Sequence, residues 1–195
     1  MKNILRTGLL GVALLVTTIS NAADKINVTL ENSTKEVNIS ISELVLGERI
    51  NVLDRNGNEI FSETVKTTNE YTKLIDFSKF EQGVHYVETI TDTEIKVTPF
   101  IIVPQQKKVI KGKTKTYAVP VFKFENNIAT VKVNNTGKQP VTISVSGSGR
   151  ELDVTKDNTA ETIEKSYSFS SVSGGDYYVL ITVGNRYFSH KVELL

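Results

Sequence analysis

The 195-residue chain contains no cysteine and no tryptophan, and it has only one methionine, four prolines and two histidines. Without cysteine it can form neither a disulfide nor a thiolate metal site, and it has no cysteine nucleophile. Two histidines leave few groups for proton transfer near neutral pH. The chain must therefore fold by burying apolar side chains or by binding an ion, and we do not expect it to be an enzyme.

An excess of either charge is also missing, since 23 basic residues face 22 acidic ones. Proteins that bind nucleic acid usually carry a basic excess or a basic patch, so we expect no nucleic-acid partner. The sequence has no nucleophile elbow, no zinc-protease motif and no phosphate-binding loop. We therefore expect neither catalytic residues nor a cofactor.

The one long apolar run lies at the N-terminus. "MKNILR" carries Lys2 and Arg6, "TGLLGVALLVTTIS" is mainly apolar, and "NAAD" supplies small residues. This is the pattern of a secretory signal peptide, and the run falls short of the about 20 apolar residues that span a membrane. We predict a signal peptide at 1–22, no membrane span, and export to the periplasm, the cell surface or the medium.

One short segment of the sequence occurs twice. "FSKFEQGVHYV" at 77–87 recurs as "FSSVSGGDYYV" at 169–179, 92 residues later, and the correspondence extends upstream. A repeat of this length predicts two tandem copies of one fold, at 24–103 and 118–195. The repeated stretch is interpreted as a strand–turn–strand corner, with glycine where the backbone bends. Its five shared positions are Phe77, Ser78, Gly83, Tyr86 and Val87 in the first copy and Phe169, Ser170, Gly175, Tyr178 and Val179 in the second. We take Phe77, Gly83 and Tyr86, with Phe169, Gly175 and Tyr178, as the residues that define the corner.

Each copy alternates apolar and polar residues, as in "KINVTLE", "EVNISIS" and "VTISVS", with turn residues about every ten positions. Seven short strands in about 80 residues predict an all-β, immunoglobulin-like antiparallel sandwich, with a small barrel as the next alternative. In the first copy the predicted strands are 25–31, 36–43, 48–54, 59–65, 71–77, 83–90 and 94–103.

Residues 104–117 separate the two copies. This segment begins with Pro104, contains five lysines and has no acidic residue. Lysine and proline discourage strand pairing, so we predict a linker here.

"LDRNGNEI", residues 53–60, permits two interpretations. Asp54, Asn56, Asn58 and Glu59 offer the oxygen ligands that calcium prefers. The spacing is not that of an EF-hand, however, and no glutamate stands at the twelfth position. Asn-Gly between strands is a strong hairpin signal. We favour the hairpin and leave calcium binding open.

The histidines and aromatic residues supply the remaining candidates. His85 and His190 lie within predicted strands, where packing is favoured over catalysis. Tyr187 and Phe188 place an aromatic ring on each face of the last strand, so one of them is a candidate for an interaction surface. Tyr71, Tyr117 and Tyr167 are also expected to face solvent more freely than the tyrosines of the repeated corner.

The corner "DFSKFEQG", Asp76–Gly83, with the strands around it resembles small immunoglobulin-like sandwich domains of exported Bacteroidota proteins. These include the C-terminal sorting domains of the type IX secretion system. The resemblance implies this fold and export from the cell. The pattern has tyrosine where this chain has His85, and the second copy has Tyr177 there.

Two functional hypotheses follow. The first is an exported, non-enzymatic binding or structural module that contacts a protein or another cell-envelope component, and less readily a glycan, through loops or by strand addition at a sheet edge. The alternative is cargo of a secretion system whose residues 118–195 are the sorting signal.

Overall fold

The computed structural model describes residues 25–31, 36–66, 69–81, 83–103, 108–147, 149–157 and 160–194. The predicted signal peptide at 1–22 lies outside these residues. The described chain consists of antiparallel strands and one short 3₁₀ helix, η1 (Phe77–Lys79), which confirms the all-β prediction. It divides between Thr116 and Tyr117 into two compact units, called here the first and the second domain. Within the described part of the chain, no helix is both long and apolar enough to cross a membrane.

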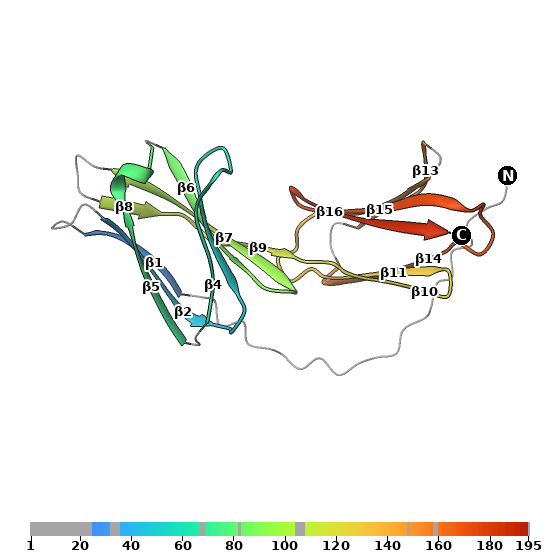
Figure 1. Cartoon of the computed structure of the whole chain (residues 1–195), viewed down its shortest axis with the longest axis horizontal. Helices are drawn as coiled ribbons and strands as arrows, with labels where there is room; N and C mark the ends of the chain where they lie inside the picture. The colour runs from blue at the N-terminus through green and yellow to red at the C-terminus, as the bar shows by residue number, and fades with distance from the viewer. Residues whose placement is uncertain are drawn as a thin grey trace. The chain divides into compact units, whose positions relative to one another are not determined.

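The first domain contains two facing sheets (Figure 1). One has the strand order β1-β2-β5 and the other has the order β4-β3-β6-β7-β8. The first seven strands agree with the predicted ranges to within two residues at either end. They are β1 (Lys25–Glu31), β2 (Glu36–Leu44), β3 (Arg49–Leu53), β4 (Glu59–Thr64), β5 (Asn69–Asp76), β6 (Val84–Ile90) and β7 (Glu94–Val103).

Alternation along the strands builds the core between these sheets. Val37, Ile39 and Ile41 of β2 point inward and are at most 1% exposed, while the residues between them are half-buried. Ile50 of β3 and Val87 of β6 meet them from the opposite sheet in one apolar cluster. Burying each such side chain contributes about 1.5–3 kcal/mol. The core therefore lies between two sheets, as in the predicted sandwich.

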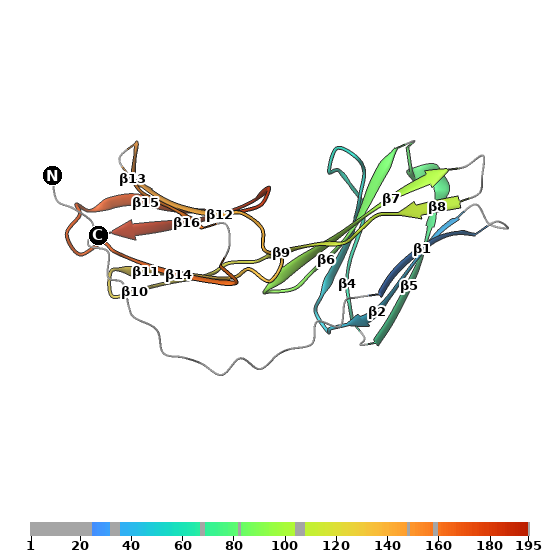
Figure 2. The same cartoon turned by 180° about the vertical axis from the view of Figure 1, so that it is seen from behind.

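The segment expected as a linker, 104–117, differs from that expectation. It contains β8 (Lys108–Lys111), which pairs antiparallel with the outer edge of β7, and most of β9 (Lys115–Ala118), which also pairs with β7. Strand β8 lies beside β7 in both Figure 1 and Figure 2. Val109 packs against the core, and the Lys111 ammonium donates a hydrogen bond to the Ile26 carbonyl at 2.6 Å. An edge strand can carry lysines because their charged ends reach solvent or a free carbonyl.

The second domain also has two facing sheets, with the orders β10-β11-β14 and β13-β12-β15-β16 (Figure 2). Its core contains inward residues of both sheets, among them Val131, Ile143 and Ile181. The strands are β10 (Val121–Glu125), β11 (Ile128–Asn134), β12 (Val141–Gly147), β13 (Arg150–Asp157), β14 (Thr162–Ser168), β15 (Gly175–Val183) and β16 (Arg186–Leu194).

The two domains share one strand order. Counted within each domain, the first, second and fifth strands form one sheet, and the fourth, third, sixth and seventh lie side by side in the other. Pairing agrees as well, because His85 lies opposite Phe100 and, 92 residues later, Tyr177 lies opposite Val192. The duplication of one fold stays a prediction about the origin of the chain.

Candidate interaction surface

The repeated corner precedes β6 in the first domain and β15 in the second. Gly83 has a φ of 138° and Gly175 a φ of 136°. Residues with a Cβ rarely adopt such angles, so glycine is required at the same point of each domain. These two predicted corner glycines therefore direct the chain into the central strand of a sheet.

In the second domain the rest of the corner is packed. Phe169 is 2% exposed, and its ring meets that of Tyr177 edge to face at 5.3 Å. The Tyr177 hydroxyl donates to the Ser173 carbonyl at 2.8 Å. Tyr178 points the other way and is 44% exposed. Of these residues, only Tyr178 is available to a ligand or partner.

In the first domain, Phe77 begins η1, and its side chain lies outside the described part of the structure. Tyr86 is half-buried on the outer face of β6. The inward position belongs to His85, whose ring packs against those of Phe80 at 5.1 Å and Phe100 at 5.5 Å. Burial lowers the pKa of His85, and its Nδ1 atom is buried without a hydrogen-bond partner.

His190 also packs against an aromatic ring. It stacks on Phe122 with a centroid separation of 4.3 Å and an angle of 6° between the ring planes. Burial lowers its pKa below the usual value. Both histidines therefore have the packing role favoured from the sequence.

The loop considered for calcium is a hairpin turn between β3 and β4. One Asp54 carboxylate oxygen accepts hydrogen bonds from the backbone N–H groups of Asn56 and Asn58, each at 2.8 Å. The other accepts the Asn58 side-chain amide, also at 2.8 Å. These hydrogen bonds lower the pKa of Asp54. Among the described residues, no cluster of three or more histidines or carboxylates could hold a metal ion.

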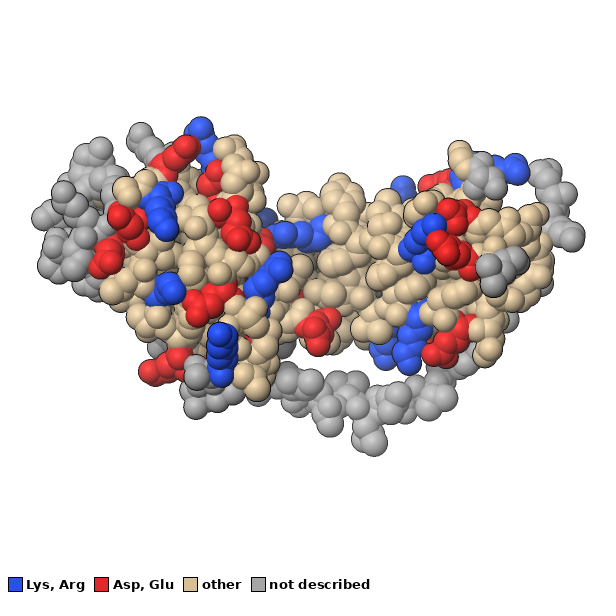
Figure 3. All heavy atoms as spheres, in the orientation of Figure 1, with Lys and Arg blue, Asp and Glu red and all other residues tan. Residues whose placement is uncertain are grey.

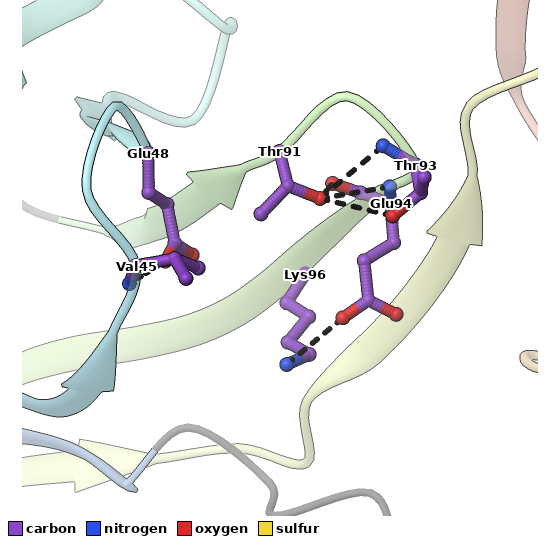
Figure 4. Close-up of polar contacts among 6 residues, drawn as sticks. All are labelled: Val45, Glu48, Thr91, Thr93, Glu94 and Lys96. Carbon is purple, nitrogen blue, oxygen red and sulfur yellow. Dashed lines mark hydrogen bonds and ion pairs between the residues drawn. The ribbon is translucent and has the colours of Figure 1, made fainter. Parts of the chain in front are cut away.

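One end of the first domain holds a group of polar contacts that the sequence analysis did not identify (Figure 4). Glu48 is 4% exposed, and its carboxylate accepts the Val45 N–H at 3.1 Å. The Thr91 hydroxyl accepts the Glu94 N–H at 3.1 Å, and Glu94 pairs with Lys96 at 3.0 Å. These contacts hold the β2–β3 and β6–β7 turns. A threonine three residues before a glutamate is a local turn signal that could have found the second of them.

An open hollow of about 350 Å³ lies at one end of the second domain's larger sheet. It combines the Tyr178 ring with the charged side chains of Arg150, Glu151 and Asp176. Ser146, Gly147 and Gly149 complete its lining. The hollow is at the small end of the size range of ligand pockets, which begins at about 300 Å³.

The outer face of the same sheet continues from this hollow. Tyr178 and Leu180 of β15 are 44% and 39% exposed, and Tyr187 of β16 is 72% exposed. Phe188 points inward and packs against the core. The structure thus places Tyr187, of the predicted pair, on the exposed face.

Two other tyrosines differ from the expectation that they face solvent. Tyr117 is 7% exposed and lies 5.5 Å from the Arg186 guanidinium, while Tyr167 is 2% exposed within the core. Tyr71 is half-buried, and its hydroxyl donates to Glu63 at 3.0 Å. The number of tyrosines open to a partner is therefore smaller than expected.

Charge does not define a surface on the first domain. On the face visible in Figure 3, its acidic and basic side chains are interspersed. One of its ion pairs, Lys73 with Glu63 at 3.1 Å, is solvent-exposed and contributes little to stability. Nothing on this face favours a strongly charged ligand.

Part of the chain is similar to a known protein family. Residues 21–104 match the family described as the secretion system C-terminal sorting domain. The match covers the first domain, whereas the sequence analysis considered residues 118–195 as the sorting signal. It indicates export through a secretion system to the cell surface or beyond. No curated protein matches the chain.

Three solved structures are similar to the chain only at low sequence identity and low TM-score. A two-domain fibronectin type III segment of chicken tenascin has 14% identity, covers 88% of this chain and 99% of its own, and has a TM-score of 0.30. The BSP domain of a biofilm associated protein has 12% identity, covers 87% and 29%, and has a TM-score of 0.27. Parabacteroides merdae β-glucuronidase has 10% identity, covers 88% and 25%, and has a TM-score of 0.27. These scores are too low to bear on function.

The family match and the strand order agree on the first domain. The resemblance predicted from the sequence is confirmed there: residues 21–104 are similar to the secretion system C-terminal sorting domains, and they fold as an immunoglobulin-like β-sandwich.

Proposed function

We propose that the chain is non-enzymatic cargo of a type IX secretion system, delivered to the cell surface or the medium. The first domain acts as its sorting domain, and the second domain is the part that contacts a partner outside the cell. The observation that carries this proposal is the match of residues 21–104 to secretion system sorting domains.

The chemistry of the described residues supports a non-enzymatic role. His85 and His190 are each packed against aromatic rings, and burial lowers the pKa of both side chains. The open hollow of the second domain is lined by two carboxylates and an arginine, with no histidine among its lining residues. A surface for binding suits these groups better than a site for proton transfer.

The test is to express the full chain in a bacterium that has a type IX secretion system and in an isogenic strain that lacks it. We expect the protein on the surface or in the medium of the first strain and in the periplasm of the second. The same distribution in both strains would overturn the proposal. The intact mass of the exported form will show in addition where the chain is processed.

A matched pair of substitutions locates the sorting function. Gly83→Ala and Gly175→Ala each put a Cβ at a φ close to +137°, with no atom nearer than 3.7 Å in either place. Each should strain one domain by about 1–3 kcal/mol without a clash. We expect Gly83→Ala to reduce export and Gly175→Ala to leave it unchanged, at equal loss of stability. The opposite result would assign sorting to residues 118–195.

A further inference from the structure

We propose that the outer edge of β16 accepts an additional antiparallel strand from a partner protein. β16 is the last strand of its sheet, and among the described residues no strand pairs with its outer edge. Its counterpart in the first domain is β7, whose outer edge carries β8 and β9. The first domain therefore shows where an additional strand would pair in the second domain. This inference does not depend on the sorting proposal.

Pairing establishes that β7 and β16 correspond. Val87 lies opposite Thr98 in the first domain, and Val179 lies opposite His190 in the second. Each residue of the second pair follows its counterpart by 92 positions, like the pairs His85–Phe100 and Tyr177–Val192. The two strands thus occupy the same place in the strand order, and corresponding positions face inward.

The inward side chains of β16 are less buried than those of β7, as expected if β16 lacks a neighbouring strand on its outer edge. Thr98 and Ile102 of β7 are 0% and 5% exposed, and Val109 of β8 lies opposite Ile102 and packs against the core. The corresponding residues of β16, His190 and Leu194, are only half-buried. An added strand with apolar inward side chains would remove this surface from water, which is the main driving force for association.

The edge of β16 is straight and long enough to pair. Its nine residues pair with β15 without a shift of register. A two-residue turn joins the strands, and in such a hairpin the closing pair, here Val183 and Arg186, is hydrogen bonded. By the alternation of an antiparallel ladder, Tyr187, Ser189 and Lys191 direct their backbone N–H and C=O groups outward.

Two of the other sheet edges in the second domain, those of β13 and β10, are less suitable than the edge of β16. The pairing of β13 with β12 shifts register between Val145 and Ser146, and such a bulge twists an edge away from partners. β10 has only five residues and follows Pro120. The β16 edge is therefore the better template.

A lysine on an edge strand often prevents another strand from pairing there, because its charge would have to be brought close to the incoming strand. Here the Lys191 ammonium contacts Asp176 of the neighbouring strand β15 at 3.0 Å and also pairs with Glu193. These two partners hold its charge beside the sheet. The outward backbone groups next to it stay accessible.

The residues of β8 and of the segment after it, which pair with β7, indicate which side chains a partner of β16 would carry. Val109 faces the core, Ile110 is 48% exposed on the outer face, and lysines and threonines follow. The partner of β16 is accordingly an extended protein segment that places a β-branched residue on its inward face and carries further β-branched, lysine and hydroxyl side chains beside it. Its inward residues would cover His190 and Leu194.

The experiment uses the full chain and a fluorescent peptide with the sequence of residues 108–118, KVIKGKTKTYA. Wild type should bind this peptide saturably in fluorescence anisotropy. Ser189→Pro removes an outward N–H without removing a bond to β15, so it should weaken binding about tenfold or more. Ser189→Ala keeps the N–H and should bind like wild type.

Hydrogen exchange on the same complex locates the peptide. We expect it to protect the outward amides of Tyr187, Ser189 and Lys191, and circular dichroism should show that both variants remain folded. Absence of saturable binding, equal binding by Ser189→Pro, or protection confined to another edge, including β7, would each overturn the proposal.

Discussion

His85 of β6 and Tyr177 of β15 occupy the same position in the two domains, two residues after a glycine of positive φ and facing the core. The two side chains differ in whether their polar atoms have hydrogen-bond partners. The Tyr177 hydroxyl donates to the Ser173 carbonyl at 2.8 Å, whereas the His85 Nδ1 atom is buried without a partner. At this position the first domain thus has a buried polar atom without a hydrogen-bond partner, and the second domain does not.

The first prediction concerns pH. Burial lowers the pKa of His85, so the unfolded chain binds a proton more readily than the folded domain does. Stability of the first domain is therefore complete above the unfolded pKa of about 6.5 and falls as the pH drops below it, by at most about 1.4 kcal/mol per pH unit for one proton. Native-state hydrogen exchange of β6 amides at about pH 7.5 and about pH 5, on either side of that pKa, measures this loss of stability.

The matched variant is His85→Phe, which cannot titrate. It should remove the loss of stability between about pH 6.5 and pH 5, because carboxylates titrate mainly at lower pH. A variant that keeps the full pH dependence of wild type would show that another group causes it.

The second prediction tests the close approach of two strands. A Cβ added at Gly147 would lie 2.3 Å from Cδ1 of Tyr177, whose ring is 5% exposed and held by its hydroxyl. Gly147→Ala should therefore lower the free energy of unfolding of the second domain by about 1–3 kcal/mol. Chemical denaturation followed by tyrosine fluorescence measures this. Ser146→Ala, on the outer face, is the control and should change stability by less than about 0.5 kcal/mol.

The third prediction concerns a buried amide that joins two loops. Asn135 is 0% exposed; its side chain donates to the carbonyls of Gln139 at 2.9 Å and Ala160 at 3.3 Å, and accepts the Gln139 N–H at 2.9 Å. Asn135→Ala should cost about 2–4 kcal/mol because these groups lose their partner inside the protein. Thermal unfolding provides the measurement. Gln139→Ala keeps the backbone groups and should cost less than half as much.

The fourth prediction concerns calcium. Both carboxylate oxygens of Asp54 already accept hydrogen bonds within the turn, so calcium ions or a chelator should leave the unfolding midpoint unchanged. Asp54→Ala should lower the midpoint. Since the folded pKa of Asp54 is lowered, its contribution is present above the unfolded value of 3.8 and is lost as the pH falls below it. A midpoint that rises with calcium in wild type but not in Asp54→Ala would contradict the hairpin interpretation.

Local pattern was enough to predict most of the fold. The alternation of Val37, Ile39 and Ile41 indicates a half-buried strand in any setting, and Asn-Gly at 56–57 indicates a hairpin. The residues of η1 and of the segment at 108–118 were less accurately predicted. For the second, the lysines suggested a linker, but an edge strand exposes one side to solvent and tolerates them.

The sequence by itself determined the all-β fold class and the bounds of most strands of the first domain, because both depend on the period of the side chains. It also determined that the corner bends at Gly83 and Gly175, because only glycine readily adopts those backbone angles. Only the tertiary structure decided which edge each domain covers and which polar groups are buried. Those outcomes, such as β8 on β7, the open edge of β16 and the amide of Asn135, depend on contacts between residues far apart along the chain. A local pattern carries no information about such contacts.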